Sequence, residues 1–359
     1  MIRILHAADL HLDSPFAALR PEQARTRREE QRQVLQRLVQ ACNSMDCRLL
    51  LLSGDLFDSD RVFRQTAELL CDVLGQCRAR VFIAPGNHDY YGPFSPYASL
   101  CWPENVHIFR SRTPEAVRLE DTGLTVYGAA FTAPHDAPLL EGFHAGPGLS
   151  VMTVHGELTA ASGLYGPIPP QQAEESGLSY LALGHIHRGF VKTLGGVTVG
   201  NPGCAMGRGF DETGEKGALC VELDEGGCRV KPVPLGARQY SVYTVNVTGK
   251  DPLAAALAAL PEKAKEEICR VVFTGTAAAP PDARLIAALE EKVRDLEIVD
   301  QTLPELELWA GLEEDSLKGV FLRRMKAVYD EAAPEDRPTA AAAARLTLSL
   351  MEGREVAEE

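Results

Sequence analysis

Paired cysteines are missing from this sequence of 359 residues. It has nine cysteines, but none forms a Cys-x-x-Cys pair, and they are scattered from residue 42 to residue 269. An odd number of scattered cysteines favours reduced, buried thiols over a disulfide framework. The pattern therefore excludes a small disulfide-stapled scaffold and argues against a zinc site built from thiolates.

Long apolar runs and an excess of positive charge are missing as well. No run approaches the roughly 20 apolar residues that a membrane helix requires. Asp9 follows Met1 too closely for a signal peptide, so we expect a cytoplasmic protein that does not enter a membrane. The net charge of −14 argues against a protein that coats nucleic acid by general electrostatics. It is compatible with an enzyme whose metals and local arginines hold one phosphate.

Short apolar runs that end in polar residues are what the sequence has instead. Leu49-Leu50-Leu51-Leu52 leads to Gly54 and Asp55, which indicates a fully buried strand that carries a carboxylate to the rim of a sheet. Four further runs, at 2–5, 80–83, 150–154 and 180–183, end before Asp9 and His11, Asn87 and His88, His155, and His185 and His187. Sites in open α/β sheets form beyond the carboxyl ends of strands. We therefore predict one site there, with Asp55 bridging two metal ions.

The length and the order of the patterns predict more than one domain. Residues 1–235 begin with a βαβαβ pattern, with helices near 21–43 and 62–77, and we expect an α/β sandwich of two sheets. The strands near 106–109, 116–119 and 124–128 are assigned to the second sheet, and 231–236 is predicted to be a linker. Residues 240–305 fit a small βαβαβ cap domain. Residues 313–359 are predicted to be a helical segment, with helices at 316–329 and 338–351.

Five short motifs are informative only as an ordered set. They are Asp9-Leu10-His11, Gly54-Asp55-Leu56-Phe57-Asp58, Gly86-Asn87-His88-Asp89, His155-Gly156 and Gly184-His185-Ile186-His187. Each is weak alone, but the ordered set resembles the calcineurin-like metallophosphoesterase superfamily, and within it the SbcD-type DNA repair exonucleases. The stretches 9–16, 201–203, 208–212 and 214–217 resemble a YhaO-like branch. The resemblance is strong over residues 1–235 and loose beyond them.

This resemblance implies a ligand set for two divalent metal ions. Asp9, His11, Asp55 and His187 would bind one ion, and Asp55, Asn87, His155 and His185 would bind the other. Such mixed carboxylate, imidazole and amide ligands suit Mn²⁺, Fe²⁺ or Zn²⁺. We expect Mn²⁺, with Mg²⁺, Fe²⁺ and Zn²⁺ as the alternatives. His88 would protonate or stabilise the leaving oxygen. Asp58 would orient His88 through a hydrogen bond.

The implied function is hydrolysis of phosphodiester bonds by a metal-dependent DNA exonuclease or endonuclease in DNA repair. The implied partners are DNA, an SbcC-like coiled-coil ATPase and a second copy of the chain, which would dimerise through residues 62–77. Helix 316–329 either docks on the ATPase or packs on its own domain. Two other functions stay open, namely a phosphatase or cyclic-nucleotide phosphodiesterase, and a non-catalytic scaffold for the ATPase.

Several residues outside the ligand set have more than one interpretation. We expect His6 to be a core histidine, and His135 and His144 to be ordinary loop residues. Asp89 either caps a turn or supports a ligand. Arg208 and Lys216 contact the substrate backbone or form solvated salt bridges.

Overall fold

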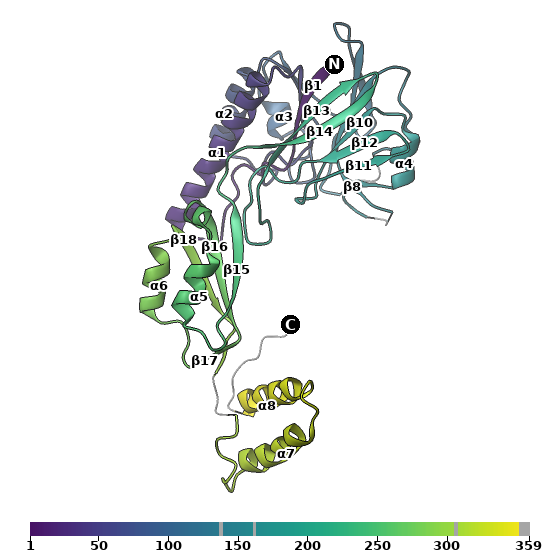
Figure 1. The fold of residues 1–359 in the computed structure, drawn as a ribbon. Helices are drawn as coiled ribbons and strands as arrows, with labels where there is room; N and C mark the ends of the chain where they lie inside the picture. Colours follow the sequence, from purple (N-terminus) through teal and green to yellow (C-terminus); the bar gives the residue numbers. More distant parts are fainter. Residues whose placement is uncertain (136–138, 161–162, 305–307, 352–359) are drawn as a thin grey trace. The chain divides into compact units, whose positions relative to one another are not determined.

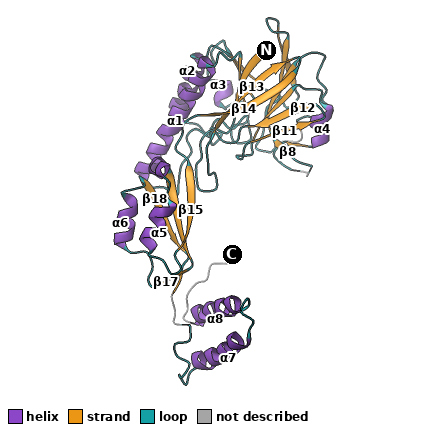
Figure 2. Cartoon of the chain, viewed as in Figure 1, coloured by secondary structure: helices purple, strands orange, loops and turns teal. Residues whose placement is uncertain are grey.

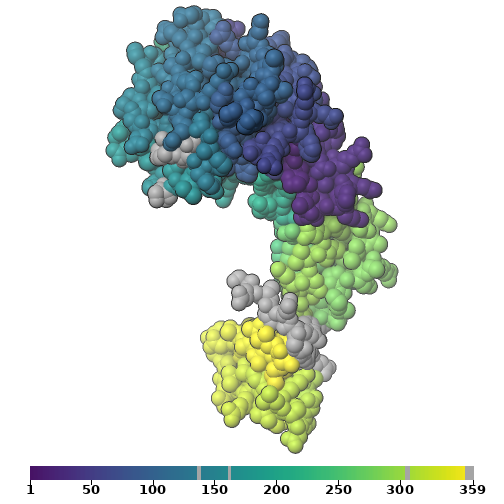
Figure 3. Space-filling view, turned by 180° about the vertical axis from the view of Figure 1, so that it is seen from behind, coloured from purple at the N-terminus to yellow at the C-terminus, as the bar shows by residue number. Residues whose placement is uncertain are grey.

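The computed structural model describes residues 1–135, 139–160, 163–304 and 308–351. The chain divides into two units, Met1–Gln239 and Tyr240–Glu359, which Figure 1 colours from purple to green and from green to yellow. Figure 3 colours the molecular surface by residue number in the same way. Residues 305 and 352–359, which end the predicted cap and C-terminal segments, lie outside the described residues.

Two six-stranded sheets form the first unit, which confirms the predicted two-sheet α/β sandwich (Figure 2). The first sheet has the order β14-β13-β1-β2-β3-β4, with bounds Gly227–Pro234, Gly217–Asp224, Ile2–Ala7, Leu49–Leu52, Arg80–Ile83 and Val106–Ile108. The second has the order β11-β12-β10-β7-β6-β5, with bounds Phe190–Leu194, Val197–Asn201, Tyr180–Gly184, Ser150–His155, Leu124–Gly128 and Glu115–Leu119. A small pair, β8 (Glu157–Leu158) and β9 (Pro167–Ile168), stands apart.

The leucine run of β2 is buried on both of its faces. Leu49 and Leu51 join the core between the two sheets, which also contains Tyr180. Leu50 and Leu52 point the other way, into the core beneath the helices. Successive side chains of a strand point to opposite faces, so a strand covered on both sides must be apolar throughout. This is why the sequence shows a continuous apolar run here and not an alternating one.

The described residues of the first unit form four helices: α1 (Pro21–Ser44), α2 (Arg64–Gly75), α3 (Pro96–Ser99) and α4 (Pro170–Glu175). Helix α1 begins at Pro21, whose missing N–H costs nothing in the first turn. Its buried stripe includes Val34, Leu35 and Leu38, which pack in one core with Leu70 of α2 and with the first sheet. The two predicted helices are thus confirmed to within two residues at each end.

Two predictions about the first unit were wrong. Strand β4 belongs to the first sheet and not the second, because Val106–Ile108 pairs in parallel with β3. The predicted linker 231–236 is largely the end of β14, which pairs with β13 over its whole length. Pro232 and Pro234 suggested a break in structure, but β14 is an edge strand, and edge strands tolerate residues that lack an N–H donor.

The second unit contains the predicted βαβαβ pattern and a helical hairpin. Strands β15 (Tyr240–Asn246), β16 (Ile268–Thr274) and β18 (Asp295–Asp300) form a parallel sheet, with α5 (Pro252–Ala259), a 3₁₀ turn (Glu262–Glu266) and α6 (Ala283–Glu290) between them. Strands β17 (Thr276–Ala277) and β19 (Leu303–Pro304) pair with each other. Helices α7 (Leu317–Glu331) and α8 (Arg337–Met351) pack together around Leu322, Ala344 and Leu348. Among the described helices, none is both long and apolar enough to cross a membrane.

His6 of β1 is a core histidine, as predicted. Its side chain is fully buried, with Nδ1 at 2.8 Å from the Tyr180 hydroxyl and Nε2 at 2.9 Å from Ser53 Oγ. Burial lowers the pKa of this imidazole from 6.5 to about 3. The folded protein therefore favours the neutral ring across the range in which the unfolded chain takes up a proton.

This difference predicts that His6 weakens the fold in acid. Between pH 6.5 and about 3 the unfolded state binds the extra proton, so stability falls as the pH falls. Replacing His6→Gln should remove up to about 1.4 kcal/mol per pH unit from the slope of unfolding free energy against pH. Urea unfolding of both proteins at several pH values within this window measures the slope. An unchanged slope would show that His6 titrates normally in the fold.

Candidate metal centre

The candidate site lies at the carboxyl ends of adjacent strands from both sheets. Asp9, Asp55 and Asn87 follow β1, β2 and β3, which are neighbours in the first sheet. His155 ends β7 and lies opposite Gly184 of β10 in the second. Backbone hydrogen bonds join the loops, since Asp9 N donates to Gly54 O at 3.0 Å and His11 N donates to Asp55 O at 2.9 Å.

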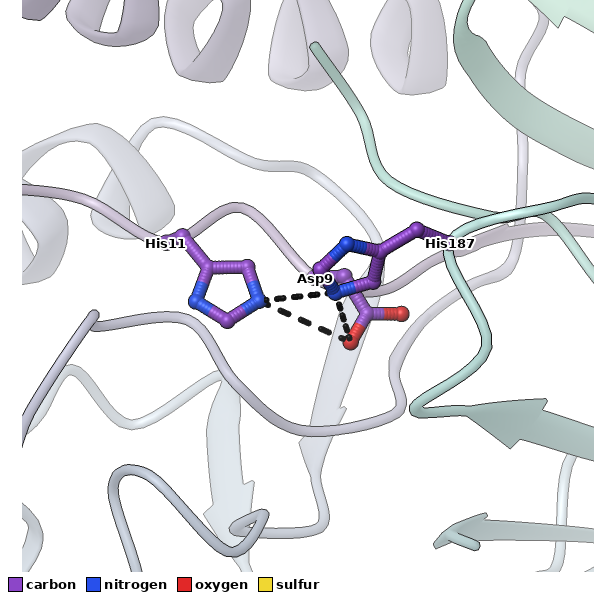
Figure 4. Close-up of side chains that lie close together, drawn as sticks. All are labelled: Asp9, His11 and His187. Atoms are coloured by element: carbon purple, nitrogen blue, oxygen red, sulfur yellow. Dashed lines mark hydrogen bonds and ion pairs between the residues drawn. The ribbon is translucent and has the colours of Figure 1, made fainter. Parts of the chain in front are cut away.

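Asp9, His11 and His187 form the first cluster (Figure 4). The Nε2 atoms of His11 and His187 are 3.1 Å apart, and Asp9 Oδ1 lies 4.0 Å from the first and 3.8 Å from the second. Figure 4 shows the three side chains pointing toward one another. All three ligand atoms lie within 4.8 Å of one another. The structure therefore brings together three of the four residues predicted for the first metal ion.

Asp55 lies between this cluster and the second one. Its Oδ2 is 3.8 Å from His11 Nε2 and 3.4 Å from His155 Nε2. His155 Nε2 is also 2.9 Å from Asn87 Oδ1. The ring of His185 packs against that of His155, with centroids 5.2 Å apart. The side chains of six predicted ligands are thus linked through their ligand atoms, and the ring of the seventh, His185, packs beside them. Asp55 has the central position that its predicted bridging role requires.

The backbone of the site adopts conformations that side chains rarely allow. Asp9, His11, Asp55 and His185 have φ values of 51°, 44°, 50° and 87°. Residues other than glycine seldom occupy this left-handed region, and those that do are concentrated at functional sites. Such strain persists only where the surroundings hold it, and here the interlocked loops do so. Four of the seven ligand positions share this feature.

Glycines are required where the loops pass close to other groups. A Cβ on Gly184 would lie 2.1 Å from the backbone oxygen of Ser53. A Cβ on Gly86 would lie 2.2 Å from Asp55 Oδ1 and 2.6 Å from the Asp55 backbone nitrogen. The glycines of two motifs thus allow the ligand-bearing loops to approach one another.

Electrostatics at the site favour a cation. Burial, reinforced by the neighbouring charge of Asp55, raises the pKa of Asp9 to about 7. Burial would also raise the pKa of Asp55, but His155 and His11 outweigh it and lower that pKa. Burial lowers the pKa of His155, but the charge and hydrogen bond of Asp55, the charge of Asp9 and the hydrogen bond to Ser53 together raise that pKa to about 9. Protons balance the buried carboxylates here, and metal binding to such groups displaces protons.

The donor set fits two divalent cations. Two carboxylates, four imidazoles and one amide oxygen converge, and these ligand types suit Mn²⁺, Fe²⁺ or Zn²⁺. Two ligands about 2.1 Å from one ion lie no more than about 4.2 Å apart. The 3.1 Å between His11 Nε2 and His187 Nε2 satisfies this limit. The two histidines of the first cluster can therefore bind one ion without rearrangement of the fold.

His88 lies beside the ligands on the exposed side of the site. Its backbone N–H donates to Asp55 Oδ1 at 3.0 Å, and its ring packs edge-on against His11 with centroids 5.1 Å apart. Its Nδ1 is 3.0 Å from the backbone oxygen of Asp58. A carbonyl oxygen only accepts, so Nδ1 carries the proton of this bond. Nε2 is left as the nitrogen available to a substrate.

The Asp58 carboxylate differs from its predicted role. Its Oδ1 lies 3.1 Å from His11 Nδ1 and accepts hydrogen bonds from Ser14 and Arg208. A carboxylate oxygen of Asp58 also lies within 4.8 Å of a ring nitrogen of His88, but the hydrogen bond to His88 comes from the backbone oxygen. The residue orients His88 through its main chain and faces a predicted metal ligand with its side chain. A main-chain contact of this kind carries no side-chain signal in a sequence.

Outer contacts hold the remaining ligands. Glu212 Oε1 accepts a hydrogen bond from His187 Nδ1 at 2.5 Å, and the Ser53 carbonyl accepts one from His155 Nδ1 at 2.9 Å. Such partners fix the tautomer and orientation of metal-binding histidines. Tyr165, whose ring lies 5.2 Å from that of His185, adds an aromatic wall. No role was predicted for Glu212 or Tyr165 from the sequence, although Glu212 lies in the stretch 208–212 that resembles the YhaO-like branch.

The structure decides some of the open interpretations. Asp89 is buried and holds the turns, since its carboxylate accepts hydrogen bonds from the backbone of Leu56 and Gly86, each at 2.7 Å, and from the Tyr97 hydroxyl at 2.6 Å. Arg208 pairs with Asp58 and Glu212 inside the site. His144 is an exposed loop residue, as predicted.

Comparison with known proteins decides the family. The family model for calcineurin-like phosphoesterases matches residues 2–189, more than half of the chain. The chain belongs to the calcineurin-like phosphoesterase family. A relative from Bacillus subtilis (strain 168), the uncharacterized metallophosphoesterase YhaO, is 33% identical over 251 residues. That match covers 63% of this chain and 58% of the relative, so it spans less than two thirds of the relative's length.

Solved structures resemble the chain at low identity. A Thermus thermophilus protein, TT1561, is 13% identical with a TM-score of 0.42, and the match covers 64% of this chain and 98% of that one. A dimetal phosphatase from Danio rerio is 10% identical with a TM-score of 0.42, covering 66% of this chain and 97% of that one. An archaeal phosphodiesterase is 15% identical with a TM-score of 0.36, covering 65% and 100%.

Proposed function

We propose that this phosphoester hydrolase is a two-metal nuclease that cleaves phosphodiester bonds in DNA. The observation that carries the two-metal part is the position of Asp55 Oδ2, within 3.8 Å of His11 Nε2 and 3.4 Å of His155 Nε2. Support for DNA as substrate comes from the motif set, which resembles SbcD-type exonucleases, and from the separate α/β unit that follows the catalytic one. Mn²⁺ is the proposed metal.

The residues of the chain have distinct tasks in this reaction. Two divalent cations, when bound, lower the pKa of water and neutralise charge on a phosphate. Asp9, His11 and His187 would hold one ion, Asn87, His155 and His185 would hold the other, and Asp55 would serve both. His88 presents Nε2 to the leaving oxygen and, when both ring nitrogens carry protons, donates the Nε2 proton as the bond to phosphorus breaks. The Asp58 carbonyl keeps the His88 ring in that orientation.

Linear DNA incubated with Mn²⁺ or Mg²⁺ tests the proposed substrate. We expect the wild-type chain to release nucleotides or fragments and to cleave p-nitrophenyl phosphate and cyclic nucleotides poorly. Cleavage of the small esters with no attack on single- or double-stranded DNA would show that the protein is a phosphatase or cyclic-nucleotide phosphodiesterase and not a nuclease. Cleavage of none of them by protein that carries metal would favour the scaffold.

The partners proposed with this function are an SbcC-like coiled-coil ATPase and a second copy of the chain. The α7–α8 hairpin buries Leu322 but exposes Leu317, Val320 and Val328, with 77% of Leu317 accessible. Phe63, at the start of α2, is 74% exposed, where the dimer contact is proposed. Recovery of a coiled-coil ATPase with the full chain, and its loss on Leu317→Glu, is the expected result. Equal recovery with both proteins would exclude this face of α7.

A further inference from the structure

Arg208 lies between two carboxylates behind the first cluster. Its Nη1 donates to Asp58 Oδ1 at 2.7 Å and its Nη2 donates to Glu212 Oε1 at 3.3 Å. Asp58 Oδ1 lies 3.1 Å from His11 Nδ1, and Glu212 Oε1 accepts from His187 Nδ1 at 2.5 Å. A continuous series of contacts therefore connects the back of one histidine to the back of the other.

We propose that Arg208, Asp58 and Glu212 form a clamp in which Arg208 is the positioning residue for both histidines. The inference rests on the proposed two-metal function. Glu212 Oε1 accepts a hydrogen bond from His187 Nδ1, and Asp58 Oδ1 lies at ion-pair distance from His11 Nδ1. An imidazole held at its Nδ1 in this way leaves the Nε2 lone pair free for a cation. Without Arg208 the two anions lose the cation between them, and both side chains are free to turn. The clamp thus keeps the Nε2 atoms of His11 and His187 facing each other at 3.1 Å.

The fold holds the clamp in place from helix α1. Arg27, which is 1% exposed, donates to the Gly207 carbonyl at 2.7 Å, directly before Arg208. One turn further along α1, Gln31 donates to the His11 carbonyl at 2.7 Å. The Arg208 backbone N–H donates to Glu212 Oε2 at 2.7 Å. One helix therefore fixes the loops at both ends of the clamp.

The second position has no such support in the described part of the chain. Behind His155 lies the neutral Ser53 carbonyl, and the ring of His185 packs against Tyr165. The clamp should therefore act on the first position alone, which distinguishes it from a general effect of charge on the site.

A role for Arg208 in binding substrate predicts a different result. Its side chain is 25% exposed, and both Nη atoms are engaged by the carboxylates. Binding a phosphate would require it to leave at least one of them. A substrate contact would raise KM and leave metal binding unchanged, whereas the clamp changes metal binding in the absence of substrate.

Titration of the metal-free full-length chain with Mn²⁺, followed by the EPR signal of free Mn²⁺, tests the clamp. Arg208→Ala should weaken the binding of one of the two Mn²⁺ ions about 10- to 100-fold, which is the range for groups that hydrogen-bond to metal ligands. The affinity for the other ion should be unchanged. Arg208→Lys keeps the positive charge but loses the forked N–H donors of the guanidinium, so its affinity should lie between those of the wild type and Arg208→Ala. Arg188→Ala is the matched control, because Arg188 is exposed and adjacent to His187 in the chain. It should bind both ions as the wild type does.

Two results would overturn the clamp. One is wild-type binding of both ions by Arg208→Ala, and the other is a change in KM alone. Circular dichroism checks the fold, and Glu212→Gln, which keeps the shape of the side chain, carries the same expected loss if Arg208→Ala does not fold. If the wild-type chain binds two Mn²⁺ ions but leaves DNA intact, the proposed nuclease function is wrong, whereas the clamp proposal is unaffected.

Discussion

An Asp55→Ala variant should lose metal binding and hydrolysis together. Asp55 Oδ2 lies between the two clusters, and an anionic oxygen group is needed to span two cations about 3.5–4 Å apart. Removing it leaves each position without its shared negative charge. We expect metal content to fall from two ions per chain to fewer than one, and activity to fall to background.

Metal content by elemental analysis and DNA cleavage on the same preparation measure this loss. Asp60→Ala is the matched control, since Asp60 is exposed and lies five residues further along the chain. It should keep both metals and most of the activity. Retention of both ions by a folded Asp55→Ala protein would assign the bridge to another group.

His88→Ala should separate metal binding from turnover. The contact from His88 to Asp55 comes from the backbone N–H, so truncating the side chain leaves it in place. The variant should hold both ions and lose about 10²- to 10⁴-fold in kcat, the usual contribution of one positioned acid or base. Metal titration and steady-state kinetics on the same DNA substrate measure the two quantities.

His144 offers a control that matches His88 closely. It is also exposed, and its Nδ1 is 2.9 Å from a backbone oxygen, that of Glu175. His144→Ala should therefore leave kcat unchanged. Loss of metal in His88→Ala would make His88 a ligand, and unchanged kcat would remove it from the reaction.

The position of the site could be predicted because strand ends are visible in the sequence. Apolar runs such as Leu49–Leu52 mark buried parallel strands, and parallel strands place the residues that follow them at one edge. The residue types then indicated metal chemistry. The cap strands and both C-terminal helices were found by the same periodicity, which local side chains determine.

Features that depend on distant contacts could not be predicted. The left-handed backbone of Asp9 and Asp55 is held by hydrogen bonds between loops that are far apart in the sequence and leaves no compositional mark. The pairing of β4 with β3 and of β14 with β13 depends on sheet order and not on local pattern. The Asp58 carboxylate faces His11 because Arg208, 150 residues away, pairs with it.

Anomalous diffraction from crystals of the full chain grown with Mn²⁺ tests the central claim most directly. The account predicts two peaks about 3.5–4 Å apart, with Asp55 in contact with both. Asp9, His11 and His187 should surround one peak, and Asn87, His155 and His185 the other. A single peak, or two peaks that do not share Asp55, would contradict the two-metal site.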